Sequence, residues 1–221
     1  MEKAMENARK MLAGWKGDSY TFGFEVLGRV GDYAAIFGKK ALLIVAELGE
    51  AWVSGTYKPV TDALRAKGLG FEAITGSRPN APREDLYRLA LHVARSRPDM
   101  IISLGGGSTI DAAKASNVLA TYSPAEVKAS LQVSEAAAST VDPYFGTGNV
   151  TKVKEQTKKA PLPMIAVQTA ASSGAHLTKY SNITDLVTGQ KKLIVDEAIT
   201  DRKSTRLNSS HSSPSRMPSS A

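Results

Sequence analysis

The 221-residue sequence lacks cysteine and contains only three histidines, His92, His176 and His211. The absence of cysteine excludes disulfide bonds, thiolate catalysis, iron–sulfur clusters and zinc sites built on thiolates. Three histidines leave few ways to assemble a metal site from protein side chains alone. The candidate chemistry must therefore be sought in other residues.

Long apolar runs are also absent. Runs such as 41–46 are far shorter than the ~20 residues that a membrane span needs. Residues 1–6 are polar and mixed in charge, without the apolar segment of a signal peptide. The composition, 42% hydrophobic and 22% charged, is that of a folded domain. We expect a soluble cytoplasmic protein that does not bind membranes.

The net charge of +7 is unevenly distributed along the sequence. Residues 201–221 hold four basic residues and one acidic residue, so they contribute +3 and leave +4 for residues 1–200. A modest positive charge is ordinary for a protein that handles anionic nucleotides. No basic stripe interleaved with aromatic residues is present, so we predict no binding of nucleic acid.

Residues 201–221 differ in character from the rest. The segment DRKSTRLNSSH at 201–211 resembles the translation of a common sequencing adapter, and 214–221 resembles the far end of that adapter in the same frame. We interpret 201–221 as a disordered, artefactual tail and expect the native sequence to be interrupted near Thr200. The alternative is a native Ser/Arg-rich disordered tail, because such segments bury too little apolar surface to become ordered.

Buried strands alternate with helices in the first 120 residues. Short apolar runs at 41–46, 71–75 and 100–104 predict strands, and periodic segments at 57–67, 84–97 and 109–120 predict helices. This alternation is typical of a parallel sheet with right-handed crossovers and helices on both faces.

Residues 121–200 are less regular. We expect a helix over 124–138, a turn over 144–149 and a buried strand over 163–167. Segments 178–185 and 190–195 flank Val187-Thr188-Gly189, which predicts a β-hairpin. The predicted fold is α/β: a Rossmann-like parallel sheet with helices on both faces plus a β-hairpin, in one dinucleotide-binding domain over 1–200.

A glycine-rich turn, Gly105-Gly106-Gly107-Ser108-Thr109-Ile110-Asp111, separates the third predicted strand from a helix. Glycines let the backbone approach a ligand, and the helix N-terminus favours phosphate. The pattern is neither Walker A nor G-x-G-x-x-G. It could instead be a tight turn with a capping box of Ser108 and Asp111. Its place at the end of a central strand favours a ligand site.

Several segments carry a family resemblance. LGGGSTIDAAKA at 104–115 resembles the cofactor motif of the iron-containing alcohol dehydrogenases. Residues 78–82, 169–185 and 190–196 are similar to further motifs of that family, so the resemblance extends along most of 20–200. It implies a cofactor-binding domain, which in this family is followed by a helical C-terminal domain that is absent here.

The resemblance implies roles for particular residues. The pyrophosphate of NAD or NADP would be held by Gly106, Gly107 and Ser108. Asp111 would lie near the nicotinamide and substrate, and Asn80 near the adenosine. The residues expected to contact the cofactor from other segments are Thr169, Ser173 and Lys191.

The sequence departs from the family pattern at several positions. Ala170, Ser172 and Ser173 stand where Thr, Gly and Thr are usual, and His176 replaces an acid. We interpret His176 as a structural or surface residue rather than a ligand.

Two adjacent residues compete for the position that selects the cofactor. The residue after the first strand discriminates NAD from NADP, because an acid there bonds the ribose hydroxyls and repels a 2′-phosphate. Ala46 at this position would admit NADP, whereas Glu47 would favour NAD. Sequence alone leaves both open.

The activity that the resemblance implies is hydride transfer between a small alcohol or aldehyde and NAD or NADP. In this family a divalent metal, iron or zinc, is held by one aspartate and three histidines of the C-terminal domain, and it polarises the alcohol oxygen. Such a ligand set is missing here, so we predict no catalytic or metal-binding residue in this chain and no activity from it alone. A homodimer is the family-level expectation.

Two alternative functions remain at this stage. One is an enzyme similar to dehydroquinate synthase or glycerol dehydrogenase, which have a similar glycine-rich turn. The other is a non-catalytic module that binds a nucleotide.

Overall fold

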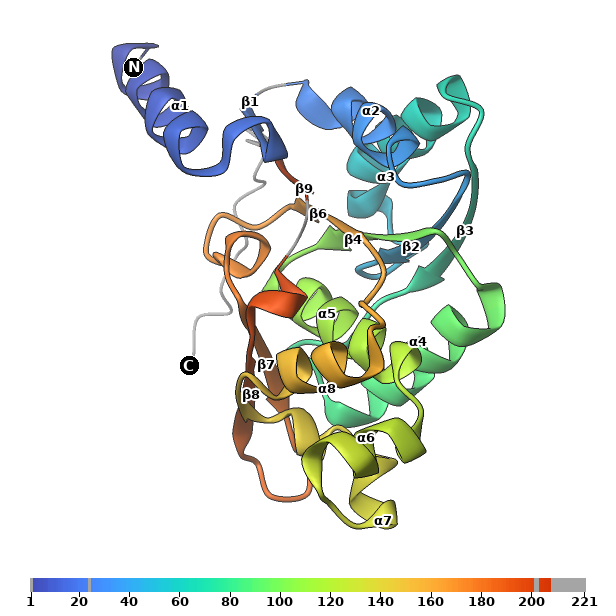
Figure 1. Ribbon diagram of the computed structural model, residues 1–221. Helices are drawn as coiled ribbons and strands as arrows, with labels where there is room; N and C mark the ends of the chain where they lie inside the picture. The colour runs from blue at the N-terminus through green and yellow to red at the C-terminus, as the bar shows by residue number, and fades with distance from the viewer. Residues whose placement is uncertain (1, 24, 201–202, 208–221) are drawn as a thin grey trace, which may run out of the picture.

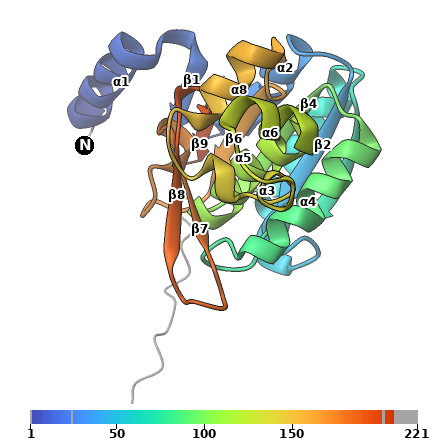
Figure 2. The same ribbon diagram turned by 60° about the horizontal axis from the view of Figure 1, so that its bottom comes forward.

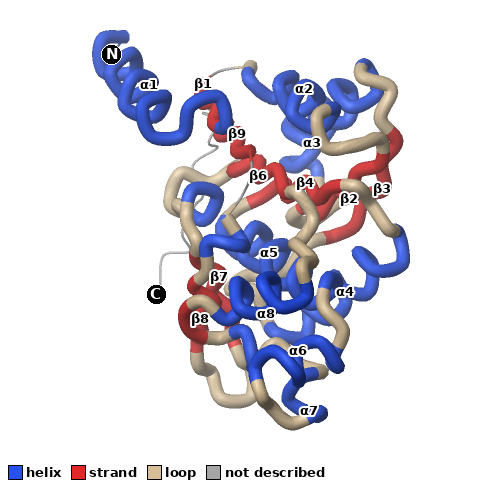
Figure 3. Tube along the Cα trace, in the orientation of Figure 1, coloured by secondary structure: helices blue, strands red, loops and turns tan. Residues whose placement is uncertain are grey.

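A parallel sheet forms the centre of the molecule (Figures 1 and 3). The computed structural model describes residues 2–23, 25–200 and 203–207. Within them the sheet has six strands in the order β1-β9-β6-β4-β2-β3, and all neighbours are parallel. The strands are β1 (Tyr20–Gly23), β2 (Lys40–Val45), β3 (Gly70–Thr75), β4 (Met100–Gly105), β6 (Met164–Gln168) and β9 (Lys203–Leu207).

Helices cover both faces of this sheet, as predicted. The helices are α1 (Glu2–Lys16), α2 (Arg29–Ala35), α3 (Ala51–Ala66), α4 (Arg83–Ser96), α5 (Gly107–Thr121), α6 (Pro124–Leu131), α7 (Glu135–Ala138) and α8 (Asn149–Thr157). Figure 1 shows α2 and α3 on one side of the sheet and α4, α5 and α8 on the other, while α1 projects away.

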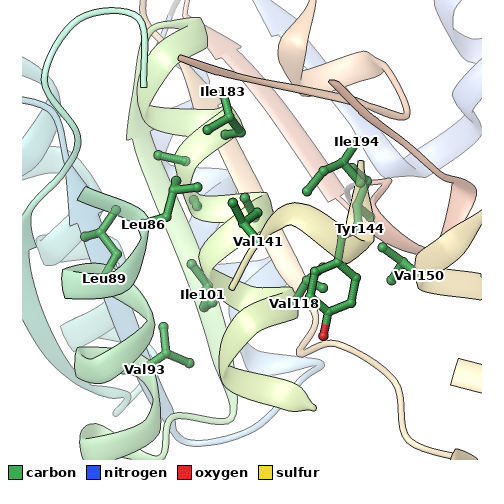
Figure 4. Close-up of a cluster of buried hydrophobic side chains, with 14 of the residues drawn as sticks. Leu86, Leu89, Val93, Ile101, Val118, Val141, Tyr144, Val150, Ile183 and Ile194 are labelled. Carbon is green, nitrogen blue, oxygen red and sulfur yellow. The ribbon is translucent and has the colours of Figure 1, made fainter. Parts of the chain in front are cut away.

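Alternate residues of the central strands supply the two hydrophobic layers. Leu42 and Ile101 face the layer that contains α4 and α5, whereas Leu43 and Ile102 face α2 and α3. All four are at most 1% exposed, which explains why these strands read as continuous apolar runs. Figure 4 shows the stripe of α4, Leu86, Leu89 and Val93, beside this first layer. The apolar residues whose spacing predicted the helix therefore form the face that α4 buries.

The predicted hairpin is present and belongs to a second sheet. Strands β7 (Tyr180–Thr184) and β8 (Lys191–Val195) are antiparallel, and β8 also pairs with β5 (Gly146–Thr147). In Figure 2 the hairpin extends alongside the body of the molecule. It packs against α5 through Ile183, so it carries its residues to the start of that helix.

The single helix predicted over 124–138 is wrong. Helix α6 ends at Gln132, whose φ of 55° is left-handed, and Ser134 begins α7 by accepting a hydrogen bond from Ala137 N–H. A left-handed residue cannot continue a right-handed helix. Residues 149–157, for which no helix was predicted, form α8, in which Val150 and Val153 are buried. Helix α3 begins at Ala51, earlier than predicted, with Val53 buried in its first turn.

The structure also differs from the disorder predicted for 201–221. Lys203–Leu207 form β9, which pairs with β1 on one side and β6 on the other. An extended segment there satisfies the backbone groups of both neighbouring strands. The rest of that predicted tail, 201–202 and 208–221, lies outside the described residues. Within the described part of the chain, no helix is long and apolar enough to cross a membrane.

Candidate functional site

The loops that follow β2, β3, β4 and β6 lie side by side at the carboxyl end of the sheet. Ala46 N–H donates to Leu104 O over 2.8 Å, and Thr169 N–H donates to Gly105 O over 3.0 Å. Gly76, after β3, donates to Val45 O over 2.7 Å. These bonds fix the four loops side by side at the carboxyl end of the sheet, where ligands bind in open α/β folds.

The glycine-rich turn has two tightly packed positions and one open position. A Cβ on Gly105 would lie 2.6 Å from Thr109 Oγ1, and one on Gly107 would lie 2.5 Å from Ser173 Oγ. A Cβ on Gly106 would meet only Ala170 Cβ, at 3.6 Å. Gly105 and Gly107 are therefore explained by packing, whereas packing does not explain the absence of a side chain at Gly106.

Helix α5 starts without a side-chain cap. Its N-cap residue, Gly106, has no side chain, and the capping box of Ser108 and Asp111 that the sequence offered as an alternative is not formed. Ser108 Oγ instead accepts a hydrogen bond from Asn80 N–H over 2.9 Å, and Asp111 is buried. A helix N-terminus of this kind presents backbone N–H groups to an anion.

Asn80 connects three separate segments around the turn. Its N–H reaches Ser108, its side-chain oxygen accepts from Lys191 Nζ over 3.1 Å, and its carbonyl accepts from Thr184 Oγ1 over 2.7 Å. Asn80 has a φ of 66°, a left-handed conformation that asparagine tolerates better than most residues. The predicted site residues Asn80, Ser108 and Lys191 thus form one cluster.

Asp111 lies in a neighbouring cavity of about 360 Å³. The cavity is also lined by Ser172, Ser173, Gly174, Ala175, Thr178, Tyr180, Asn182 and Leu193. Asp111 is 7% exposed; its Oδ2 accepts from Asn182 Nδ2 over 3.4 Å, and its Oδ1 has no hydrogen-bond partner among the described residues. Burial raises the pKa of Asp111 to about 6, although the charge of Lys114 opposes the rise.

The loop after β6 joins the cluster to this cavity. Thr169 is tied to the glycine turn by its backbone, and Ser173 packs on Gly107. Ser173 Oγ accepts from Ala175 N–H over 3.1 Å. The structure therefore brings all eight predicted residues to the carboxyl end of the sheet. Asn80, Ser108 and Lys191 are joined by hydrogen bonds, and Asp111 and Ser173 line the neighbouring cavity.

A second cavity, of about 370 Å³, lies at the ends of β2 and β3. Glu47 lines it, and Trp52 Nε1 donates to Glu47 Oε2 over 2.9 Å. Ala46 lies instead against Gly105, where a Cβ would be 2.8 Å from the Ala46 Cβ. The sequence left open whether Ala46 or Glu47 occupies the position that discriminates NAD from NADP. Of these two residues, Glu47 lines the cavity.

The basic residues of this cavity already have acceptors. Arg78 pairs with Asp85, and hydrogen bonds from Arg78 hold the pKa of Asp85 below its ordinary value against the opposing effect of burial. Arg88 donates to the carbonyls of Thr75 and Gly76. Of the two acids on the cavity, Asp85 is paired with Arg78, whereas Glu47 accepts a hydrogen bond from a neutral group, the indole of Trp52.

Sequence reasoning missed Lys114, one turn after Asp111 on α5. Lys114 is only 2% exposed, and its Nζ donates to the carbonyls of Ala175 and Thr178, each over 2.6 Å, and of Tyr180 over 3.3 Å. A lone lysine in an alanine-rich helix beside Asp111 was the available signal. His176, by contrast, is structural as expected: it is 2% exposed and stacks on Tyr20 at 5.7 Å.

The metal ligands that the family resemblance implies are not supplied by this site. Among the described residues, no group of three or more His, Asp or Glu is placed to hold a metal ion. The uncapped start of α5 is instead suited to an anionic group.

A comparison with protein-family models matches residues 18–201 to the family described as iron-containing alcohol dehydrogenase. Sulfoacetaldehyde reductase of Bilophila wadsworthia is 28% identical over 160 residues, 72% of this chain and 35% of that protein. NADPH-dependent butanol dehydrogenase of Clostridium saccharobutylicum is 28% identical over 163 residues, 74% of this chain and 37% of that protein.

Among solved structures, NADH-dependent butanol dehydrogenase A from Thermotoga maritima superposes with a TM-score of 0.69 at 20% identity. The match covers 86% of this chain and 42% of that protein, and it shows that the two share a fold. The chain spans well under half the length of each of these relatives.

Proposed function

The chain belongs to the iron-containing alcohol dehydrogenase family, and from this premise we propose that it supplies the NAD(P)-binding part of an enzyme that transfers hydride between a small alcohol or aldehyde and nicotinamide. The observation that carries the proposal is the open Gly106 at the uncapped start of α5. There a pyrophosphate can approach the backbone without meeting a side chain.

The residues around the turn bind the pyrophosphate of the cofactor. Gly106, Gly107 and Ser108 hold the pyrophosphate through backbone N–H groups, and Lys191 adds a positive charge from the hairpin. Asn80 fixes Lys191 and Ser108 in place on this side. The backbone N–H groups supply hydrogen-bond donors and Lys191 supplies a positive charge, which together suit a doubly negative pyrophosphate.

The nicotinamide end belongs in the cavity that holds Asp111. A bound nicotinamide supplies the hydride acceptor or donor. Thr169 and Ser173 contact the cofactor from the loop after β6, and Asp111 lies on the wall of the same cavity.

The adenosine end belongs at the second cavity, and we propose that Glu47 favours NAD over NADP. A carboxylate at the end of this strand accepts hydrogen bonds from ribose hydroxyls and repels a 2′-phosphate. The C. saccharobutylicum relative is NADPH-dependent by name, so this preference separates the two proteins.

The proposal assigns no metal-dependent step to the described residues, because no group of three or more His, Asp or Glu among them could hold a metal ion. We therefore propose that this chain binds cofactor but does not by itself oxidise alcohols. The alcohol or aldehyde substrate and homodimer formation follow from family membership and are proposals for the whole enzyme.

The direct test is fluorescence titration of the purified chain with NADH and NADPH. The variant Gly106→Ala places a methyl group in the open position without disturbing the fold, and Gly55→Ala on α3, where nothing lies within 4 Å, is the matched control. We expect wild type and Gly55→Ala to bind NADH, and Gly106→Ala to bind at least about tenfold more weakly because one good phosphate contact is lost. Equal affinity of the two variants, or no binding by wild type, would overturn the proposal.

A further inference from the structure

The buried Lys114 of α5 has no part in the cofactor contacts described above. Its ammonium group has three donors, and the three carbonyls of Ala175, Thr178 and Tyr180 accept from it. Burying an unpaired ammonium group is very unfavourable, so these bonds are strongly favoured in the folded chain. The lysine and the segment that holds the carbonyls must therefore stay together.

That segment is one wall of the Asp111 cavity. Ala175, Thr178 and Tyr180, whose carbonyls bind Lys114, all line the cavity, as does Asp111 itself. The segment runs from the short 3₁₀ helix Ala175–Leu177 into β7, so regular main-chain pairing does not hold its first residues. Lys114 lies behind this wall and fixes its position relative to α5.

Two further side-chain contacts hold the continuation of the same segment. Ser181 Oγ donates to Asp111 O over 2.7 Å, and Asn182 Nδ2 donates to Asp111 Oδ2 over 3.4 Å. Neither reaches residues 175–178. Among the described residues, the charged contact of Lys114 therefore links the earlier part of the wall to the helix.

We propose that Lys114 is a positioning residue: its ammonium group holds segment 175–180 against α5 and thereby keeps the wall of the Asp111 cavity in the shape that receives the nicotinamide end of the cofactor. The identity of the ligand rests on the proposed function; the positioning of the wall does not.

The experiment compares Lys114→Met, which keeps the length of the side chain and removes its charge, with Lys152→Met on the exposed surface of α8 as the control. Amide hydrogen exchange of residues 175–182 reports the wall directly, and NADH titration reports its consequence. We expect Lys114→Met to exchange faster at 175–182 and to bind NADH about tenfold more weakly, as loss of a charged hydrogen-bonding group predicts. Lys152→Met should match wild type in both.

Chemical complementation separates positioning from general stabilisation. Lys114→Ala leaves room for n-propylammonium, which replaces the missing part of the side chain and its charge. We expect this ion to restore protection at 175–182 and NADH affinity, whereas n-propanol should not. If Lys114→Met loses protection throughout the chain, restoration of Lys114→Ala by n-propylammonium still supports the proposal, and failure to restore it overturns it.

The outcomes also separate this inference from the proposed function. If wild type binds no NADH but Lys114→Met still loosens 175–182 selectively, the cofactor assignment fails and the positioning role stands. Unchanged exchange and unchanged NADH affinity in Lys114→Met would overturn the positioning role and leave the cofactor assignment intact.

Discussion

Lys191 and Asn80 are far apart in the sequence, yet Lys191 Nζ donates to Asn80 Oδ1 over 3.1 Å. The contact joins the hairpin to the loop after β3, directly beside the start of α5, because Asn80 N–H also reaches Ser108. A hairpin that follows β6 by many residues is thereby fixed to a loop that precedes β4. The cluster of Asn80, Ser108 and Lys191 is consequently a property of the tertiary fold rather than of one motif.

Replacing Asn80 separates its backbone role from its side-chain role. The φ of 66° strains alanine but not glycine, so Asn80→Ala should be about 1 kcal/mol less stable than Asn80→Gly. Both variants lose the acceptor for Lys191 and should bind NADH more weakly than wild type. Urea unfolding measures the first difference and fluorescence titration the second; equal free energies of unfolding for the two variants would contradict the backbone argument.

Adjacent lysines of β8 provide a matched pair. Lys191 is exposed and contacts Asn80, whereas Lys192 lies near Asp142, at 3.7 Å, and over the ring of Phe145. We expect Lys191→Met to weaken NADH binding several-fold with an effect that shrinks at high salt, because exposed charges are screened. Lys192→Met, which removes the same charge one residue away, should leave the affinity near that of wild type. Titrations at two ionic strengths check both expectations.

The elements that the sequence predicted well are those whose pattern reflects burial alone. Strands β2, β4 and β6 are apolar throughout because both faces are covered, and α4 shows its stripe because one face is. The hairpin also followed from its pattern. The eight residues predicted from the family motifs lie together at the carboxyl end of the sheet, and their cofactor roles stay predictions.

Features decided by single backbone angles or distant partners could not be predicted. Gln132 ends α6 in a left-handed conformation without being a glycine, so nothing in the pattern marked the break. Ser108 and Asp111 have capping-box spacing, but they form no capping box. The hydroxyl of Ser108 accepts a hydrogen bond from Asn80 N–H instead, and the side chain of Asp111 is buried. The φ of 50° at Glu47, together with the packing of Ala46 on Gly105, decides which of the two lines the second cavity.

Replacing Glu47 tests the cofactor preference. In Glu47→Gln the charge that repels a 2′-phosphate is gone, while the side chain still accepts from Trp52. We expect the ratio of NADPH affinity to NADH affinity to rise about tenfold, which corresponds to roughly 1.4 kcal/mol of relieved repulsion. Glu50→Gln, a nearby exposed change outside this cavity, is the control. An unchanged ratio in Glu47→Gln would remove Glu47 from the adenosine site.

Asp111 gives the folded chain a distinctive dependence on pH. Its pKa rises from 3.8 to about 6 on folding, so the folded state holds the proton more tightly than the unfolded state. Stability should therefore fall as pH rises from about 4 to about 6 and stay reduced above that range, by roughly 3 kcal/mol at about 1.4 kcal/mol per pKa unit.

Asp111→Asn removes this ionisation and keeps an acceptor for Asn182. The variant should gain stability relative to wild type as pH rises, with little difference near pH 4 and the full difference at pH 8.

Asp99 should change stability with pH in the opposite direction. Hydrogen bonds from the backbone of Lys39 and Lys40 lower its pKa, so Asp99 stabilises the fold above its unfolded pKa and loses that effect as pH falls. Asp99→Asn should accordingly be destabilising at pH 7 and neutral in acid. Urea unfolding of Asp111→Asn from pH 4 to pH 8, and of Asp99→Asn from pH 7 down to about pH 2, measures the two trends. If Asp111→Asn showed a gap from wild type that did not change with pH, the buried ionisation of Asp111 would be refuted.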